Sequence, residues 1–258
     1  MSLGTSSEQR ETYRELLYRD YLATHSGDLG EARRSLHGAG PYLRRLIRKF
    51  LPQDRNIRIL ELGCGYGALL YWLTQAGYRC LEGIDRSPEQ VEGAHQLGLD
   101  FVRQDDLMAH LAKRASASCD VVIAFDVLEH FAKEEALLFS DRVFRALAPG
   151  GIFIIHLPNG EGIFSGAVVY GDFTHEVTLT RKSLGQMLRC SGFSQVNTYE
   201  DTPVVHGMVS AGRYLMWKAF RTLLRVGYAA ETGDIDPGLI LTRNLLAVAR
   251  KGLPGGQR

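Results

Sequence analysis

Three glycines at alternate positions, Gly63, Gly65 and Gly67, directly follow the apolar run from Ile57 to Leu62. Such a run is typical of a buried strand, and the periodic apolar residues from Leu69 to Ala76 predict a helix after it. The glycines therefore lie on a strand-to-helix turn, where they permit positive φ angles and let a ligand approach the backbone. Because the first N–H groups of a helix have no partner within it, this turn predicts a site for a nucleotide-like ligand.

Two families of cofactor fit the glycine pattern. Gly63-x-Gly65-x-x-Ala68 satisfies the dinucleotide fingerprint, which leaves an NAD-dependent oxidoreductase as an alternative. The longer stretch Glu61-Leu62-Gly63-Cys64-Gly65-Tyr66-Gly67 closely resembles the first motif of class I S-adenosylmethionine-dependent methyltransferases. In that family the acidic residue closes the strand, and the glycine turn holds the methionine part of the cofactor. The resemblance thus implies S-adenosylmethionine, bound by Glu61, Gly63, Cys64, Gly65, Tyr66 and Gly67.

Carboxylates also follow the next three predicted strands. Asp85 ends the strand from Cys80 to Ile84, Asp105 and Asp106 follow Phe101-Val102, and Asp126 follows residues 121–125. Ligands of parallel sheets bind outside the carboxyl ends of the strands, so these side chains should converge on the glycine turn. Asp85 is suited to accept hydrogen bonds from both ribose hydroxyls. Asp105 or Asp106 resembles the family's adenine-reading position, with Leu107 covering the ring, and we also assign Arg86 to the cofactor site.

The segment Phe125-Asp126-Val127-Leu128-Glu129-His130 resembles the fourth-strand motif of the same family, which lines the cofactor and the acceptor cleft. By this resemblance Phe125 and Asp126 would approach the sulfonium side of the cofactor. His130 is a candidate base, with a purely structural role as the alternative.

Residues 158–180 form a glycine-rich insertion without clear periodicity, and loops of this length are usually functional or disordered. The insertion resembles the acceptor-side loop of bacterial methyltransferases of the methyltransferase-11/12 type, where an Asp-x-x-His segment precedes a helix beginning Thr-x-x-Ser. His175 is accordingly the preferred general base, oriented by Asp172 or Glu176. The alternative is a histidine that only holds the loop in place. No metal site is predicted.

Strands and helices alternate along the chain, which is the signature of a parallel sheet covered on both faces. We therefore expect an α/β fold with a doubly wound, seven-stranded, mostly parallel sheet, in which residues 242–249 form an antiparallel last strand. The expected organisation is an N-terminal helical lid (1–52), a methyltransferase domain (53–250) with the acceptor loop 158–180 and a helical insertion 204–240, and a disordered tail (251–258). The expected helices lie at 8–24, 42–51 after Pro41, 69–76, 88–97, 134–147, 180–190 and 213–226, and the strands not yet named lie at 152–157 and 194–199.

The helix predicted at 213–226 is amphipathic, with apolar residues on one side and Lys218, Arg221 and Arg225 on the other. Packing of the apolar side against the domain is the simpler interpretation. A basic amphipathic helix also suits a membrane surface or a lipid-linked substrate.

Composition sets further bounds on the 258-residue chain. The formal net charge of +1 gives no reason to expect a nucleic-acid partner. The four cysteines are far apart in sequence and are interpreted as small buried hydrophobes in a reducing compartment. The sequence has no signal-like apolar region and no apolar run of membrane-spanning length, so a cytoplasmic protein is expected. The expected acceptor is a hydroxyl, or an amine, of a sugar or another small bacterial metabolite, and a catalytically silent cofactor-binding partner is the other alternative.

Overall fold

The computed structural model describes residues 29–253 and residue 255. The chain divides into two compact units, one up to Gly40 and one from Pro41 onward. The helix predicted at 8–24 and the connector at 24–28 lie outside the described residues. The sheet, the helices that cover it and the second half of helix α3 (Leu29–Phe50) belong to the larger unit.

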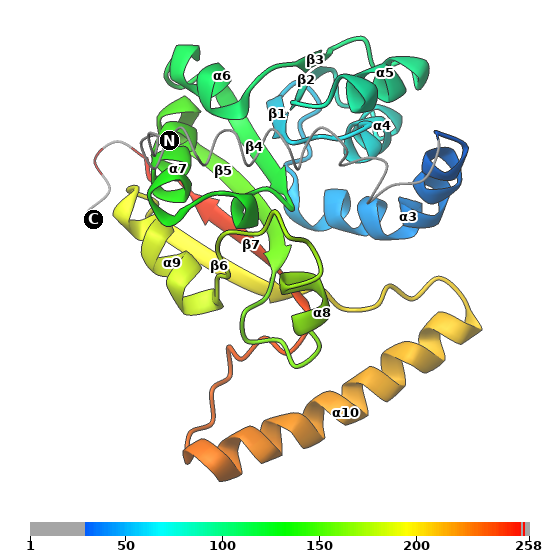
Figure 1. Cartoon of the computed structure of the whole chain (residues 1–258), viewed down its shortest axis with the longest axis vertical. Coiled ribbons are helices and arrows are strands. Elements are labelled where there is room, and N and C mark those ends of the chain that lie inside the picture. Colours follow the sequence, from blue (N-terminus) through cyan, green and yellow to red (C-terminus); the bar gives the residue numbers. More distant parts are fainter. Residues whose placement is uncertain (1–28, 254, 256–258) are drawn as a thin grey trace, which may run out of the picture. The chain divides into compact units, whose positions relative to one another are not determined.

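The larger unit is built on a seven-stranded sheet with the strand order β3-β2-β1-β4-β5-β7-β6 (Figure 1). Its strands pair in parallel from β3 to β5, and β7 pairs antiparallel with both β5 and β6. This arrangement confirms the doubly wound, mostly parallel sheet and its antiparallel seventh strand. The strands are β1 (Arg58–Leu62), β2 (Cys80–Asp85), β3 (Val102–Gln104), β4 (Cys119–Phe125), β5 (Leu147–Pro158), β6 (Gln195–Glu200) and β7 (Asn244–Arg250).

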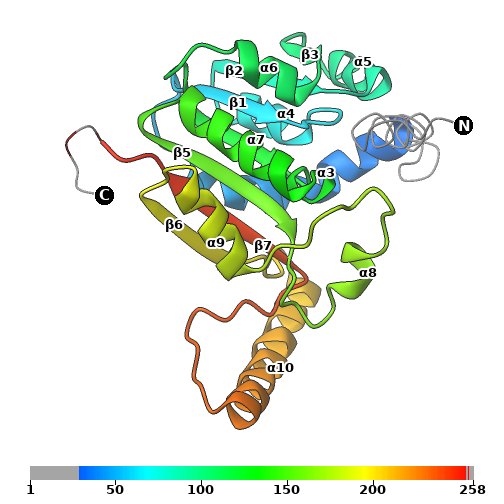
Figure 2. The ribbon, with the colours of Figure 1, turned by 60° about the vertical axis from the view of Figure 1, so that its left-hand side comes forward.

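Helices cover both faces of the sheet, as Figure 2 shows. On one face lie α6 (Leu107–Lys113), α7 (Lys133–Ala146) and α9 (Arg181–Cys190), and on the other lie α4 (Ala68–Gln75) and α5 (Pro88–Gln96). The continuous apolar run of β4 is buried on both sides, as expected for a central parallel strand. Phe139 of α7 and Phe153 of β5 are fully buried in the core that this layering creates.

Several element boundaries differ from the sequence prediction, those of α3 and β5 among them. Helix α3 runs from Leu29 to Phe50 with Pro41 inside it, so the predicted start at Tyr42 was wrong. A proline removes one backbone hydrogen bond, and here the helix continues on both sides of it. Strand β5 begins at Leu147, before the Pro149-Gly150-Gly151 turn, and its register with β4 shifts between Cys119 and Val121.

The cysteines also differ in part from expectation. Cys64 and Cys119 are buried, whereas Cys80 and Cys190 are exposed, and all four are free thiols. Cys80 is the first residue of β2 and Cys190 is the last residue of α9. At such ends of elements a side chain need not face the core. In the predicted tail, Lys251 donates a hydrogen bond from its backbone to Gly151, and residues 254 and 256–258 lie outside the described part.

Two long connections at the carboxyl edge of the sheet contain helices of their own. The insertion after β5 contains the short helix α8 (Gly166–Val169), and helix α10 (Met208–Thr232) lies between β6 and β7 (Figure 1). The apolar side of α10 faces solvent, so the prediction that it packs on the domain was wrong. Within the described part of the chain, no helix combines the length and apolar character required to cross a bilayer.

Candidate active site

The glycine turn between β1 and α4 has the backbone that the sequence predicts. Gly63, Gly65 and Gly67 have φ angles of 71°, 53° and 80°, a region that disfavours residues with a Cβ atom. A Cβ at Gly63 would lie 2.5 Å from Val127, and one at Gly67 would lie 2.5 Å from Leu99. A Cβ at Gly65 would have no neighbour nearer than 3.7 Å. Gly65 is thus the turn position with room on its surface for a ligand.

The Asp85 carboxylate faces this turn from the end of β2. It accepts hydrogen bonds from the backbone N–H of Gly65 (2.7 Å) and of Ser87 (2.9 Å). Burial raises the pKa of Asp85, and these backbone N–H groups oppose that shift. Glu61, at the end of β1, is buried, and its Oε2 accepts no hydrogen bond from the described residues. Burial and the neighbouring Asp85 raise the pKa of Glu61 to about 8.

The two neighbouring acids after β3, Asp105 and Asp106, have different hydrogen-bond partners in the structure. The Asp106 side chain accepts from the backbone N–H of Ala109 and so caps helix α6. Asp105 lies 3.2 Å from Nδ1 of His110 and is half-exposed. Leu107 is half-buried at the start of α6, and Arg86 is exposed after β2. Cys64 is buried beneath the turn, while Tyr66 is half-buried on it.

A buried histidine joins two carboxylates at the ends of the central strands. His156 of β5 lies with Nδ1 2.8 Å from Asp126 and with Nε2 3.4 Å from Asp201. Burial lowers the pKa of His156, but the two carboxylates outweigh it and raise that pKa to about 10, so the imidazole is protonated. Asp126 has a φ of 52°, which is rare for a residue other than glycine. Burial and the Asp201 carboxylate also raise the pKa of Tyr42.

The acceptor loop meets the end of β4 through a chain of polar side chains. Thr174 donates its hydroxyl hydrogen to Asp172 (2.6 Å), so its oxygen is left to accept from Nδ1 of His130 (2.8 Å). The Nδ1 atom of His175 lies 3.0 Å from the carbonyl oxygen of Val169. Since a carbonyl only accepts, His175 carries its hydrogen on Nδ1 when neutral, and its basic nitrogen is Nε2.

The structure brings His175, His130 and Asp172 together. The two imidazole rings lie with centroids 4.9 Å apart, and Nε2 of His175 lies 3.9 Å from Asp172. Burial and the neighbouring His175 lower the pKa of His130 to about 4. Glu176, the other predicted orienting residue, has an exposed side chain. Of the two predicted orienting residues, Asp172 is therefore the one that lies beside the histidines.

Glu129 is a third ionisable side chain close to His130 and His175. It is buried, its Oε2 accepts no hydrogen bond from the described residues, and burial with the nearby Asp126 raises its pKa to about 8. Ligand atoms of Glu129, His130 and His175 lie within 4.8 Å of one another, the one such group found among residues 29–253 and 255. These side chains have the chemistry to hold a metal ion, although the sequence predicts no metal site.

Three residues of the site were not predicted from the sequence. His156 is a polar residue inside the apolar run Ile154-Ile155-His156-Leu157, and this interruption was the available signal. Asp201 directly follows β6, as Asp85, Asp105 and Asp126 adjoin the ends of their strands. Tyr42 gave no local signal, because its partners lie far away in sequence.

A family model described as a methyltransferase domain matches residues 35–197. The chain belongs to this family, the class I S-adenosylmethionine-dependent methyltransferases. A probable S-adenosylmethionine-dependent methyltransferase of Mycolicibacterium smegmatis is 32% identical over 152 residues, which are 58% of this chain and 55% of that protein. The chain thus matches about half the length of this curated relative.

Solved structures share the methyltransferase fold at low sequence identity. An S-adenosylmethionine-dependent methyltransferase from Archaeoglobus fulgidus has a TM-score of 0.62 at 18% identity, over 91% of this chain and 99% of that one. Phosphoethanolamine N-methyltransferase 2 of Haemonchus contortus, in complex with S-adenosylmethionine, has a TM-score of 0.63 at 17% identity, over 91% and 60%. In this methyltransferase, the open face of Gly65 and the Asp85 carboxylate beside it fit that cofactor.

Proposed function

We propose that this methyltransferase transfers a methyl group to a hydroxyl of a small molecule, such as a sugar or another secondary metabolite, in the bacterial cytoplasm. The observation that carries the proposal is the cluster of His130, Asp172 and His175 beside the end of β4. A hydroxyl acceptor needs a base to take its proton, whereas a neutral amine does not. The two rival functions are NAD-dependent oxidation and cofactor binding without catalysis.

The residues of the glycine turn bind the cofactor in this proposal. S-adenosylmethionine supplies an electrophilic methyl group on a sulfonium, whose leaving thioether is neutral. Asp85 accepts from the ribose hydroxyls with the lone pairs that Gly65 and Ser87 do not use. Asp105 reads the adenine amino group with the lone pairs that the Asp106 N–H and His110 leave, whereas Asp106 caps helix α6. The remaining contacts come from Glu61, Gly63, Cys64, Tyr66, Gly67, Arg86, Leu107, Phe125 and Asp126.

The acceptor's proton goes to Nε2 of His175 in this mechanism. The Val169 carbonyl fixes the tautomer that leaves this nitrogen basic. Asp172 stabilises the resulting imidazolium, and His130 stays neutral because its pKa is lowered. The protein thus contributes orientation of the hydroxyl and removal of its proton.

Replacement of His175 tests this assignment. His175→Ala should lower kcat by about 10²-fold or more, since general base catalysis is worth about 10²–10⁴-fold. Affinity for S-adenosylhomocysteine, measured by calorimetry, should stay unchanged. The matched control is His206→Ala, because Nδ1 of exposed His206 also lies 3.0 Å from a carbonyl oxygen. An unchanged kcat in His175→Ala would remove this residue from the mechanism.

Chelation separates this role from metal binding. With His175 as the base, turnover in EDTA should equal turnover without it. Loss of turnover in EDTA, restored by a divalent transition metal, would instead assign Glu129, His130 and His175 to an ion.

A further inference from the structure

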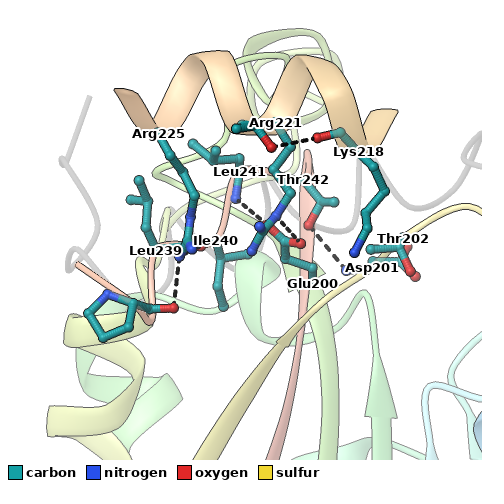
Figure 3. A network of polar contacts seen from close by, with 12 residues as sticks. Glu200, Asp201, Thr202, Lys218, Arg221, Arg225, Leu239, Ile240, Leu241 and Thr242 are labelled. Atoms are coloured by element: carbon teal, nitrogen blue, oxygen red, sulfur yellow. Dashed lines mark hydrogen bonds and ion pairs between the residues drawn. The ribbon is translucent and has the colours of Figure 1, made fainter. Parts of the chain in front are cut away.

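Helix α10 is attached to the domain through its arginines. Nε of Arg221 donates to both carboxylate oxygens of Glu200, each at 2.7 Å, at the end of β6 (Figure 3). Nη2 of Arg225 donates to the carbonyl oxygens of Pro237 (2.7 Å) and Asp236 (3.0 Å) in the connection that leads to β7. Figure 3 shows both side chains pointing from the helix towards the sheet edge. The side of the helix that contains Arg221 and Arg225 is therefore its inner side.

The apolar side of α10 faces away from these contacts. We define the outer face of α10 as Met208, Leu215, Met216, Leu223 and Val226, whose exposed fractions range from 63% to 93%. At about 100° per residue these positions fall on one side of the helix, opposite Arg221. Burial of apolar side chains away from water is favourable, so this exposure forgoes a stabilisation that packing would provide. Exposed apolar patches of this kind mark interaction sites.

The exposed apolar surface continues onto the acceptor loop. Phe164 of that loop stacks on Phe220 of α10, with ring centroids 6.0 Å apart and an interplanar angle of 21°, and Phe164 is 58% exposed. Because α10 follows β6 and the loop follows β5, both lie at the carboxyl edge of the sheet, where the candidate active site is. An occupant of the outer face would therefore lie at the same edge as the site.

The charges around the outer face indicate what this occupant is. From Met208 to Ala230 the helix contains no aspartate or glutamate. Arg213 is exposed and at about 100° per residue lies at one border of the outer face, whereas Figure 3 shows the Lys218 side chain running from the helix towards the sheet edge, on the same side of the helix as Arg225. An apolar face with a cation and no carboxylate at its border is suited to lie in the interface of a bilayer, with the cation at the headgroups.

A second copy of the chain fits this surface less well. A two-fold interface places the same patch on both partners, so Arg213 would approach its own copy. The helix has no carboxylate between Met208 and Ala230 to offset that repulsion. We propose that the outer face of α10 docks this methyltransferase on an anionic phospholipid bilayer, with its active-site edge towards the membrane.

Vesicle co-sedimentation of the full chain tests this proposal. Wild-type protein should sediment with phosphatidylcholine–phosphatidylglycerol vesicles at about 0.1 M salt, and less at about 1 M salt or with phosphatidylcholine alone. The double variant Leu215→Gln and Leu223→Gln should lower the partition coefficient about tenfold or more. Its matched control is Leu137→Gln with Leu138→Gln, two leucines of α7 that are 43% and 44% exposed. This control should sediment like the wild type.

The charged border is tested in the same assay. Arg213→Gln should weaken sedimentation about fivefold with anionic vesicles, since each cation near such a surface contributes about 1 kcal/mol. Arg79→Gln removes the same charge from an exposed site elsewhere and should have little effect. Far-ultraviolet circular dichroism checks that every variant is folded.

Several outcomes would overturn the proposal. Wild-type protein that stays in the supernatant with anionic vesicles has no bilayer-docking face. Sedimentation that is equal for the outer-face variant and the α7 control places the contact elsewhere. A dimer in light scattering that dissociates in the outer-face variant, without vesicle binding, assigns the face to a second copy.

Discussion

His156 is charged in the interior because two carboxylates offset the cost of its burial. Asp126 and Asp201 each lie within hydrogen-bonding reach of one ring nitrogen, so the three groups form a single polar cluster. One of them, Asp126, also has the left-handed backbone conformation that functional sites often retain. The charge of His156 thus holds the ends of β4 and β5 and the start of the connection to α10 together.

This charge makes a pH-dependent contribution to stability. The pKa of His156 is about 10 in the folded protein, above its ordinary value of 6.5, so protonation favours folding. The contribution is fully present below pH 6.5 and is lost as the pH rises to about 10. In urea unfolding, the difference in unfolding free energy between wild type and His156→Gln should fall by about 4 kcal/mol across this interval. Parallel pH profiles for the two proteins would mean that His156 is not protonated.

The positions of site residues could be predicted where they follow strand ends. Asp85, Asp105 and Asp126 adjoin the ends of their strands as predicted, because a carboxylate after a buried strand stands out in sequence. The pairing of His156 with Asp201 could not be found in this way, because the two residues meet only once β5, β7 and β6 are in register. The structural role of Asp106 was likewise invisible until its hydrogen bond with Ala109 was known.

At the scale of elements, the glycine turn has a conformation that the segment after strand β4 restricts. Gly63 combines a φ of 71° with a Cβ position 2.5 Å from Val127. Gly63→Ala should therefore lower the free energy of unfolding by about 3 kcal/mol, from backbone strain and overpacking together. Adding Val127→Ala should recover only the packing part, because the backbone strain remains.

The control is a glycine in an ordinary helix. A Cβ at Gly212 of α10 would have no atom within 4 Å, so Gly212→Ala should stabilise by about 0.5–1 kcal/mol. Chemical denaturation of the four proteins measures these differences. Equal stability of Gly63→Ala and wild type would show that the turn relaxes freely.

The periodicity of apolar residues predicted the positions of the helices more accurately than it predicted which side of a helix is buried. The amphipathic pattern of α10 was recognised, but not that its arginines face the sheet edge. That orientation depends on Glu200 and on backbone carbonyls near Pro237, which only the folded chain brings together. The same limit applies to Pro41, whose effect depends on the helix formed before it.

At the scale of the whole molecule, cofactor binding should stabilise the fold. Saturating S-adenosylhomocysteine at about 100 times its dissociation constant should add about 2.7 kcal/mol to the free energy of unfolding, visible as a rise in Tm. Asp85→Asn should lose most of this rise, because it removes the charge that binds the ribose while keeping an acceptor for Gly65. NADH gives no rise under this assignment, and stabilisation by NADH alone would identify an oxidoreductase.

The two ends of the connection that contains α10 lie next to each other. The backbone N–H of Asp201, after β6, donates to Oγ1 of Thr242, before β7, at 3.1 Å. Leu239, Ile240 and Leu241, just before Thr242, are buried in the domain, but in α10 only Ser210 is buried, so this helix lies outside the core between two ends that already touch. Substitutions in α10 should therefore change what the surface of the protein contacts and leave the sheet that positions the active site in place.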